Sequence, residues 1–217
     1  RDRLTVVPAA GTAIYDKAGN AASTSQSNNT ASLTEKILPT VTNVTSTTSD
    51  GSYKQGQTIA ITVEFSEVVN VDESGGTPTL TLNNTSGTNP AVDYSSGSGS
   101  TTLTFNYTIG SGETSGDLDY ATTSSLVLNS GTIKDAALNA ATLTLASPGA
   151  TNSLGANKAL IVDTSVPTIS SVSLNAANSQ LTVTFAEDVY NTNGGSGDLE
   201  VADFALSISG GLSLIHI

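Results

Sequence analysis

An internal repeat with a long period organises this chain. Six residues around an aspartate–asparagine turn recur with the same spacing: Ile14, Asp16, Ala18, Asn20, Ala21 and Ala22 match Ile133, Asp135, Ala137, Asn139, Ala140 and Ala141. Ile14 and Ile133 are 119 residues apart. A period of this length corresponds to a whole domain and not to a solenoid unit, so each copy is expected to close its own hydrophobic core.

Two further matches extend the repeat. The first consists of Val63, Phe65, Glu67 and Val69, which correspond to Val183, Phe185, Glu187 and Val189, 120 residues later. The second consists of Pro39, Thr40 and Val44, which correspond to Pro167, Thr168 and Val172, 128 residues later. Loop insertions account for the difference. We therefore predict the C-terminal part of one module in residues 1–37, a complete module in 38–166, and the N-terminal part of another in 167–211.

The two ends of the sequence carry expectations of their own. The 217 residues include no Met and open on Arg1, so we expect a piece of a longer protein, with any export signal upstream. Residues 212–217 read as the translation of a transposon end used to prepare sequencing libraries. We expect these six residues to be non-native, and the only histidine, His216, would then be lost.

Alternation of apolar and polar residues predicts β-strands throughout the complete module. Ile59, Ile61, Val63 and Phe65 alternate with Thr, Ala and Glu, which places the apolar side chains on one face of a strand. Similar patterns predict strands at 41–45, 79–82, 103–109, 126–128, 143–145 and 160–162, separated by turns rich in Gly, Ser, Asn and Asp. Helical spacing is limited to a short turn at 136–141. The predicted fold is all-β: tandem immunoglobulin-like β-sandwich modules with antiparallel strands, one complete and two partial.

Composition and motifs exclude several functional classes. With 19 acidic and 7 basic side chains, a net charge of −12, we expect no binding of nucleic acid or anionic lipid through bulk charge. The chain has no Cys for disulfides or thiolate metal sites, and no apolar run of about 20 residues predicts a membrane span. Serine–histidine–aspartate catalysis lacks a histidine outside residues 212–217. Asp117 and Asp119 could form a glycosidase pair, but there is no Trp to grip a sugar and their segment reads as the start of a strand. We therefore predict no enzymatic activity.

The excess of acid favours binding of a divalent cation, because calcium takes six to eight oxygen ligands. Five acidic residues are calcium candidates: Glu67, Asp135, Asp163, Asp50 and Asp72. Glu67 recurs as Glu187 and Asp135 recurs as Asp16, so these acids belong to the design of the module. A structural interpretation stays open, in which Asp135 and Asn139 cap their turn and Glu67 is a solvated strand end. No cofactor other than calcium is predicted.

At these motifs the chain resembles a known family. The residues concerned are Phe65, Ser66, Glu67 and Val69, the turn 135–141, and the segment 158–163 leading to Val166, Pro167 and Thr168. They resemble the tandem immunoglobulin-like repeats of giant bacterial surface proteins, of the SwmB type and of large adhesins, over residues 1–211. The resemblance implies an exported stalk or adhesin region, extracellular or at the cell surface and often rigidified by calcium between modules. Paired acidic motifs of the cadherin kind are absent, so the resemblance transfers no specific calcium ligands.

Three functional hypotheses follow. The first is a non-catalytic structural and adhesive repeat region of a large bacterial cell-surface or secreted protein. Its partners would be neighbouring modules of the same chain, and a distal domain would contact a host, cell or glycan ligand. The second is a carbohydrate-binding module, for which the stacking platforms would be Tyr53, Tyr94, Tyr107 and Tyr120, although Tyr107 alternates with core positions and is expected to be buried. The third is an accessory region of an extracellular enzyme.

Overall fold

The structure is a computed structural model that describes residues 3–8, 14–25, 27–32, 35–84 and 89–207. The chain divides into two compact units, Arg1–Thr164 and Ser165–Ile217. The predicted non-native segment 212–217 lies outside the described residues. No helix in the described part of the chain combines the length and hydropathy that a membrane crossing requires.

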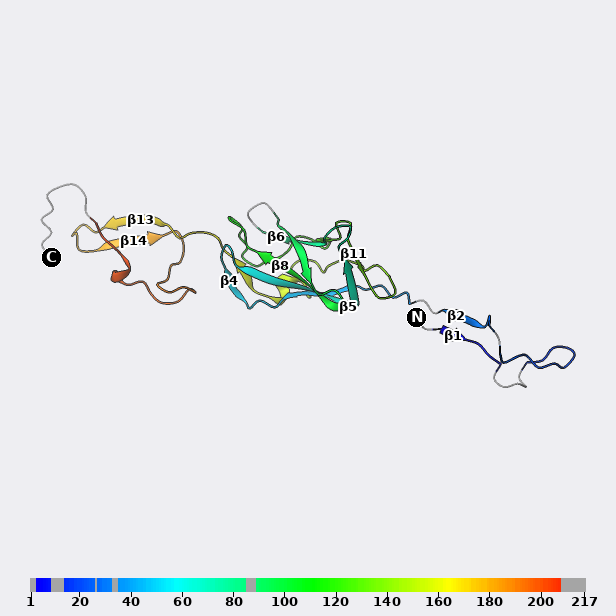
Figure 1. Ribbon diagram of the computed structural model, residues 1–217. Helices are drawn as coiled ribbons and strands as arrows, with labels where there is room; N and C mark the ends of the chain where they lie inside the picture. Colours follow the sequence, from blue (N-terminus) through cyan, green and yellow to red (C-terminus); the bar gives the residue numbers. More distant parts are fainter. Residues whose placement is uncertain (1–2, 9–13, 26, 33–34, 85–88, 208–217) are drawn as a thin grey trace. The chain divides into compact units, whose positions relative to one another are not determined.

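The first unit contains a β-sandwich, and strand β5 (Thr58–Asp72) is the centre of its first layer (Figure 1). β3 (Val41–Ser46) and β8 (Ser100–Thr108) pair with opposite edges of β5, and both pairs are antiparallel. β11 (Thr132–Lys134) pairs with the last residues of β5. β5 is therefore the longest strand of the described chain, and it continues well past the predicted strand end at Glu67.

The second layer is built around β6 (Thr79–Asn83). β7 (Ala91–Ser96), β9 (Asp119–Tyr120) and β10 (Leu126–Val127) all pair with it antiparallel. β7 also joins the two layers, because its first residues pair with β6 and its last residues pair with β8. The sheet therefore curls back on itself and encloses the core.

The core between the layers follows the predicted alternation. Ile59, Ile61, Val63 and Phe65 are all buried on one face of β5. The second layer supplies further fully buried side chains, including Leu80, Leu82, Leu118 and Tyr120. Burial of such apolar area is the main favourable term in folding, so the alternating residues define the sheet faces. The prediction of an all-β sandwich is confirmed, and the described α-helical content is α1 (Leu154–Asn157), capped by Ser153.

Three local predictions were wrong. Residues 143–145 form no strand, because the neighbouring amides donate to separate segments: Thr142 N to Pro39 O and Leu145 N to Thr123 O. Residues 136–141 form a turn closed by a bridge between Lys134 and Ala140, and not a helical turn. The strands are not all antiparallel, since β4 (Gly51–Tyr53) pairs parallel with β12 (Leu160–Val162).

The aspartate–asparagine turn has the same geometry in both copies. Asp16 N donates to Asn20 O at 3.0 Å, and Asp135 N donates to Asn139 O at 3.1 Å. In each copy the aspartate Oδ1 accepts the backbone amide of the asparagine, at 2.9 Å in the first and 2.8 Å in the second. The first copy lies close to the two-stranded pair β1 (Arg3–Thr5) and β2 (Thr30–Ser32) in the sequence. The sequence repeat is therefore also a repeat of hydrogen bonding.

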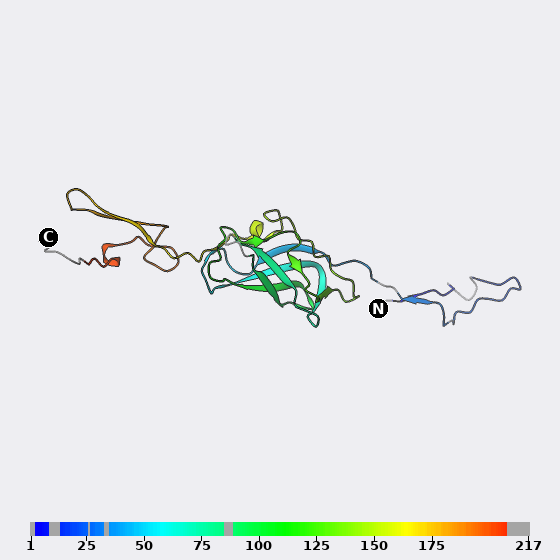
Figure 2. The same cartoon turned by 90° about the horizontal axis from the view of Figure 1, so that it is seen from above.

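The second unit contains the hairpin β13 (Ile169–Leu174) and β14 (Leu181–Phe185), followed by the short 3-10 helix η1 (Val201–Asp203) (Figure 2). Its register reproduces that of β3 and β5. Phe185 lies opposite Ile169 as Phe65 lies opposite Val41, and in both hairpins the register shifts just after this pair. The hairpin is thus the second geometric feature that the chain builds twice.

Candidate functional site

The candidate site lies where three segments of the first unit meet. Glu67 belongs to the stretch of β5 between Glu64 and Val69, where pairing with β8 shifts register. Such irregularities redirect side chains and are frequent beside functional sites. Asp135 directly follows β11, which pairs with the end of β5. The segment entering β3 is held against β5 by the bond from Ser66 N to Thr40 O at 2.9 Å, and this segment carries Glu35.

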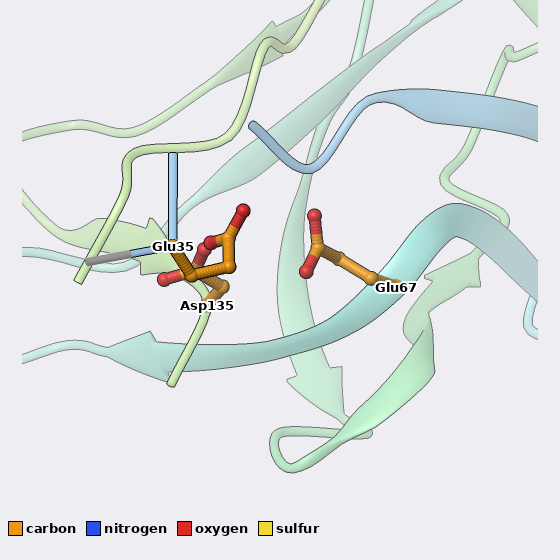
Figure 3. Close-up of side chains that lie close together, drawn as sticks. All are labelled: Glu35, Glu67 and Asp135. Atoms are coloured by element: carbon orange, nitrogen blue, oxygen red, sulfur yellow. The ribbon is translucent and has the colours of Figure 1, made fainter. Parts of the chain in front are cut away.

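These segments bring three carboxylates together. Glu35, Glu67 and Asp135 each offer an oxygen, and the three oxygens lie within 4.8 Å of one another. Figure 3 shows Glu67 projecting from β5 toward the other two side chains. In the described ranges this is the one group of three or more His, Cys, Asp or Glu residues with such spacing. Glu35 is exposed, Glu67 is half-buried and Asp135 is buried.

Asn139 holds two of the carboxylates in place. Its Nδ2 donates to Asp135 Oδ2 at 2.7 Å and to Glu35 Oε2 at 2.6 Å. The same nitrogen also lies within hydrogen-bond distance of the backbone carbonyls of Glu35 and Ile37. Asn139 therefore connects the segment before β3 with the turn after β11. The capping role predicted for Asp135 and Asn139 is confirmed.

Glu67 is the member of the group whose charge is least compensated. Among the described residues its Oε1 is buried and has no hydrogen-bond partner. Burial, and then the nearby charges of Glu35 and Asp135, raise the pKa of the Glu67 carboxyl. A buried carboxylate oxygen without a donor is unfavourable, and a bound cation or proton would relieve it. The prediction that Glu67 is a solvated strand end is wrong, because β11 pairing extends β5 beyond it.

The pKa of Asp135 is shifted in the opposite direction to that of Glu67. Burial acts to raise its pKa, but the hydrogen bonds with Asn139, Glu35 and the Ala137 amide together outweigh burial, and the pKa is lowered. The equivalent Asp16 shows the same direction, because hydrogen bonds from Asn20 lower its pKa. Asp135 is therefore kept ionised, as a cation ligand must be.

The other three calcium candidates lie elsewhere. Asp50 forms an ion pair with Lys158 at 3.0 Å and accepts the Ala159 amide, and its pKa is lowered chiefly by Lys158. Asp72 Oδ1 accepts the Ser74 amide at 2.9 Å. The backbone amide of Asp163 donates to Tyr53 O at 2.9 Å. The structure thus brings Glu67 and Asp135 together and places Asp50, Asp72 and Asp163 outside any described group of three acids.

Glu35 was not predicted from the sequence, although a signal for it exists. Glu35 stands four residues before Pro39, and Asp163 stands four residues before Pro167. The two acids are therefore 128 residues apart, which is the spacing of the prolines themselves. Extending the proline match four residues upstream identifies Glu35 as the counterpart of Asp163.

The residues considered for sugar chemistry have structural roles. Tyr107 and Tyr120 are buried, and their hydroxyls donate to Glu113 Oε2 and to Ala146 O, each at 2.7 Å. The expected burial of Tyr107 is confirmed. Asp119 is buried and accepts the amides of Tyr120 and Gly149. Neither ring is available to stack on a sugar, and the Asp119 oxygens are already engaged by backbone amides.

The remaining two predicted platforms are half-buried. Tyr53 donates its hydroxyl to Ser49 O at 2.6 Å, and Tyr94 accepts the Ser98 amide at 2.8 Å. Tyr94 also packs edge-on against Phe105, with ring centroids 6.1 Å apart.

Comparison of the chain with protein-family models, curated proteins and solved structures finds no match in any of the three.

Proposed function

We propose that the chain is a non-catalytic structural and adhesive repeat region of a large bacterial cell-surface or secreted protein, in which it spaces a distal binding domain. The supporting observation is that one hairpin and one turn are each built twice with the same register and hydrogen bonds. Repetition at the level of geometry is what a chain of similar modules produces.

The arrangement of the complete sandwich supports this proposal. The segment leading into β3 and the segment leaving β12 lie at opposite ends of the sandwich in both views (Figures 1 and 2). Modules with this arrangement add length when joined in series. Each module can also fold on its own core, so the length of an array grows with the number of copies.

A calcium site at Glu35, Glu67 and Asp135 forms part of the proposal. The group offers oxygen ligands and contains no His or Cys, a donor set that suits a hard cation such as calcium. Calcium there would compensate the buried Glu67 oxygen and offset two of the three adjacent negative charges. It would also tie the entering segment, through Glu35, to β5 and to the turn after β11. The expected consequence is a stiffer connection at the start of the complete module.

The spacer role can be tested by stretching arrays of two, three and four copies of the whole chain between an anchored surface and a probe. Each complete sandwich is expected to unfold as one event that lengthens the chain by roughly 40 nm, from about 3.5 Å per extended residue. The number of events should equal the number of copies. Unfolding in a single event whatever the copy number would contradict independent modules. Saturable binding of the chain itself to a glycan array would favour the carbohydrate-binding hypothesis over the spacer role.

The calcium site has its own test. Thermal melting and small-angle scattering of the chain are compared in calcium and in chelator, for the wild type and for Glu67→Gln. Calcium is expected to raise the melting temperature of the wild type, and Glu67→Gln should weaken calcium binding at least about tenfold because ligand charge sets affinity. Glu187→Gln removes the same charge at the equivalent position of the second unit and serves as the control. If Glu67→Gln responds to calcium as the wild type does, Glu67 is not a calcium ligand and the proposed site is wrong.

A further inference from the structure

The side-chain nitrogen of Asn139 is surrounded by more acceptors than it can satisfy. Asn139 Nδ2 lies 2.6 Å from Glu35 Oε2 and 2.7 Å from Asp135 Oδ2. The backbone oxygens of Glu35 and Ile37 lie 3.2 and 3.4 Å from the same nitrogen. An amide NH2 group has two hydrogens, so the four oxygens share two donors. The oxygens therefore converge on one point, and an amide nitrogen occupies it.

The equivalent turn shows that the extra acceptors are not needed for capping. Asn20 Nδ2 donates to Asp16 Oδ2 at 2.8 Å, and the Asn20 backbone amide donates to Asp16 Oδ1 at 2.9 Å. These two bonds repeat the bonds from Asn139 to Asp135. In the described part of the chain, no group of three acids includes Asp16. The cap is therefore complete within the turn, and the contacts from Asn139 to the segment before β3 are additional.

Glu67 adds a further oxygen to this acceptor-rich place. One of its oxygens lies within 4.8 Å of oxygens of Glu35 and Asp135, and its Oε1 is buried with no described hydrogen-bond partner. In the described ranges, no Lys or Arg forms an ion pair with any of these three acids. Oxygens that crowd around too few hydrogens repel one another, and burial makes the repulsion more costly. The arrangement therefore favours an added positive charge.

The carboxamide of Asn139 can present either of its two polar atoms to this point. Rotation about the bond between Cβ and Cγ exchanges Nδ2 with Oδ1 and changes the shape of the side chain very little. Without a cation, Oδ1 in this position would face other oxygens and be repelled, which explains why the nitrogen lies there. With calcium present the preference reverses, because calcium binds amide oxygens and not amide nitrogens.

We propose that Asn139 takes the place of the cation in the calcium-free chain and becomes one of its ligands when calcium binds. The NH2 group first holds Glu35 and Asp135 together, and rotation of the carboxamide then turns Oδ1 toward the site. Oδ1 would join one oxygen from each of the three carboxylates and the backbone oxygens of Glu35 and Ile37. These oxygens satisfy the lower end of the range of six to eight ligands that calcium takes. This inference rests on the calcium site of the proposed function.

The first test follows the side-chain amide of Asn139 by NMR in the isotopically labelled whole chain, in chelator and through a calcium titration. In chelator, the hydrogens on Nδ2 should exchange slowly with water, because they are bonded to carboxylates. Saturating calcium should speed their exchange at least about tenfold, because the rotation releases them. The side-chain amide of Asn20 is the matched control and should keep its rate. Unchanged or slower exchange at Asn139 in the calcium-saturated chain would overturn the proposal.

Two substitutions separate the ligand role from the capping role, with calcium affinity measured by calorimetry. Asn139→Asp keeps an oxygen but loses the NH2 group, so it should lower the melting temperature in chelator and tighten calcium binding at least about threefold. Asn139→Ala loses both atoms and should weaken calcium binding at least about threefold. Asn20→Asp makes the same change in the first copy of the turn and should leave the affinity unchanged. Weaker binding in both Asn139 variants would assign Asn139 a capping role alone and contradict the proposal.

The outcomes also distinguish this inference from the calcium site on which it rests. If calcium changes neither the melting temperature nor the NMR spectrum of the wild type, the site is wrong and the role of Asn139 falls with it. If the wild type binds calcium and Glu67→Gln weakens that binding while the Asn139 amide stays protected, the site stands and only the rotation is wrong. None of these outcomes alters the unfolding events that test the spacer role.

Discussion

The hairpins β3–β5 and β13–β14 share a register and differ in burial. Thr42 Oγ1 donates to Glu64 O at 3.2 Å, and Ser170 Oγ donates to Thr184 O at 3.0 Å, so even the side-chain bonds beside the register shift agree. Phe65 is only 4% exposed beneath the second layer of its sandwich. Phe185 is half-buried, and the ring contact described for it is with Phe204, at 6.4 Å between centroids.

This contrast separates two levels of structure. Pairing and register are properties of the hairpin itself, set by its own alternation and by local side-chain bonds. Burial depends on a second layer contributed by residues distant in the sequence, such as Leu80, Leu118 and Tyr120. A hairpin can therefore keep its geometry where its apolar face is not fully covered, but it gains much less stability there.

Truncating the equivalent phenylalanines should give the largest difference. Phe65→Ala is expected to lower the free energy of unfolding of the first unit by about 3–5 kcal/mol, because it removes a large side chain from a closed core. Phe185→Ala should cost less than about 1.5 kcal/mol in the second unit. Denaturant unfolding followed separately in each unit by NMR measures both values. Equal costs would show that the two faces are equally covered.

Amide exchange should show the next largest difference. Ile61 and Val63 donate into a ladder with β8, whereas Leu181 and Val183 face an edge without a described partner strand. In the whole chain, the first pair should exchange at least about a hundredfold more slowly than the second. Similar rates in the two pairs would mean that the edge of β14 is already occupied.

The second layer can be weakened through Tyr120, whose hydroxyl donates to Ala146 O. Tyr120→Phe should cost the first unit about 1–2 kcal/mol at pH 7, because the carbonyl of half-buried Ala146 loses its donor. Burial, and then Asp119, raise the pKa of Tyr120 to about 12. The ionised form is favoured in the unfolded chain from about pH 10, so stability should fall as the pH rises from 10 through 12.

Tyr120→Phe should flatten that alkaline decline, which pH-dependent unfolding by circular dichroism would measure. Tyr190→Phe, at a half-exposed position of the second unit, is the control and should leave the unfolding of the first unit unchanged. An alkaline decline of the same slope in Tyr120→Phe would assign it to another group.

The two turns offer the smallest and most local test. Gly19 has φ +91° and the equivalent Leu138 has φ +74°, a backbone region that disfavours a residue with a Cβ atom. The Leu138 side chain is 69% exposed, so little packing is lost with it. Leu138→Gly should therefore stabilise the first unit by about 0.5–1 kcal/mol in denaturant unfolding. Leu138→Ala keeps the Cβ atom and should give no such gain.

The sequence predicted the fold where pattern and burial coincide. Alternation along Ile59 to Phe65 identified the core face of β5, because a strand buried on one side must alternate. The alternation pattern gave a wrong strand at 143–145. Leu145 is buried there, but its amide donates to Thr123 O and no strand ladder forms. It also missed the parallel pairing of β4 with β12, since two three-residue strands carry too short a pattern to reveal their direction.

The candidate site was predictable in part for a similar reason. Glu67 and Asp135 recur in the repeat, and the structure places them together. Glu35 lies in the segment before β3, outside the alternating strands, so only its spacing from Pro39 connects it with the module. The burial of Glu67 Oε1 depends on β11 extending the sheet, which no local pattern indicates.

The parallel pair of β4 and β12 has a consequence for biosynthesis. Leu160 lies opposite Gly51, and Val162 also exchanges two backbone bonds of 2.8 Å with Ser115. During translation, the sandwich cannot close until Val162 has emerged from the ribosome, more than a hundred residues after β4. Up to that moment the nascent chain is an incomplete sheet with an uncovered apolar side, and such late, distant pairings make folding slow and aggregation-prone.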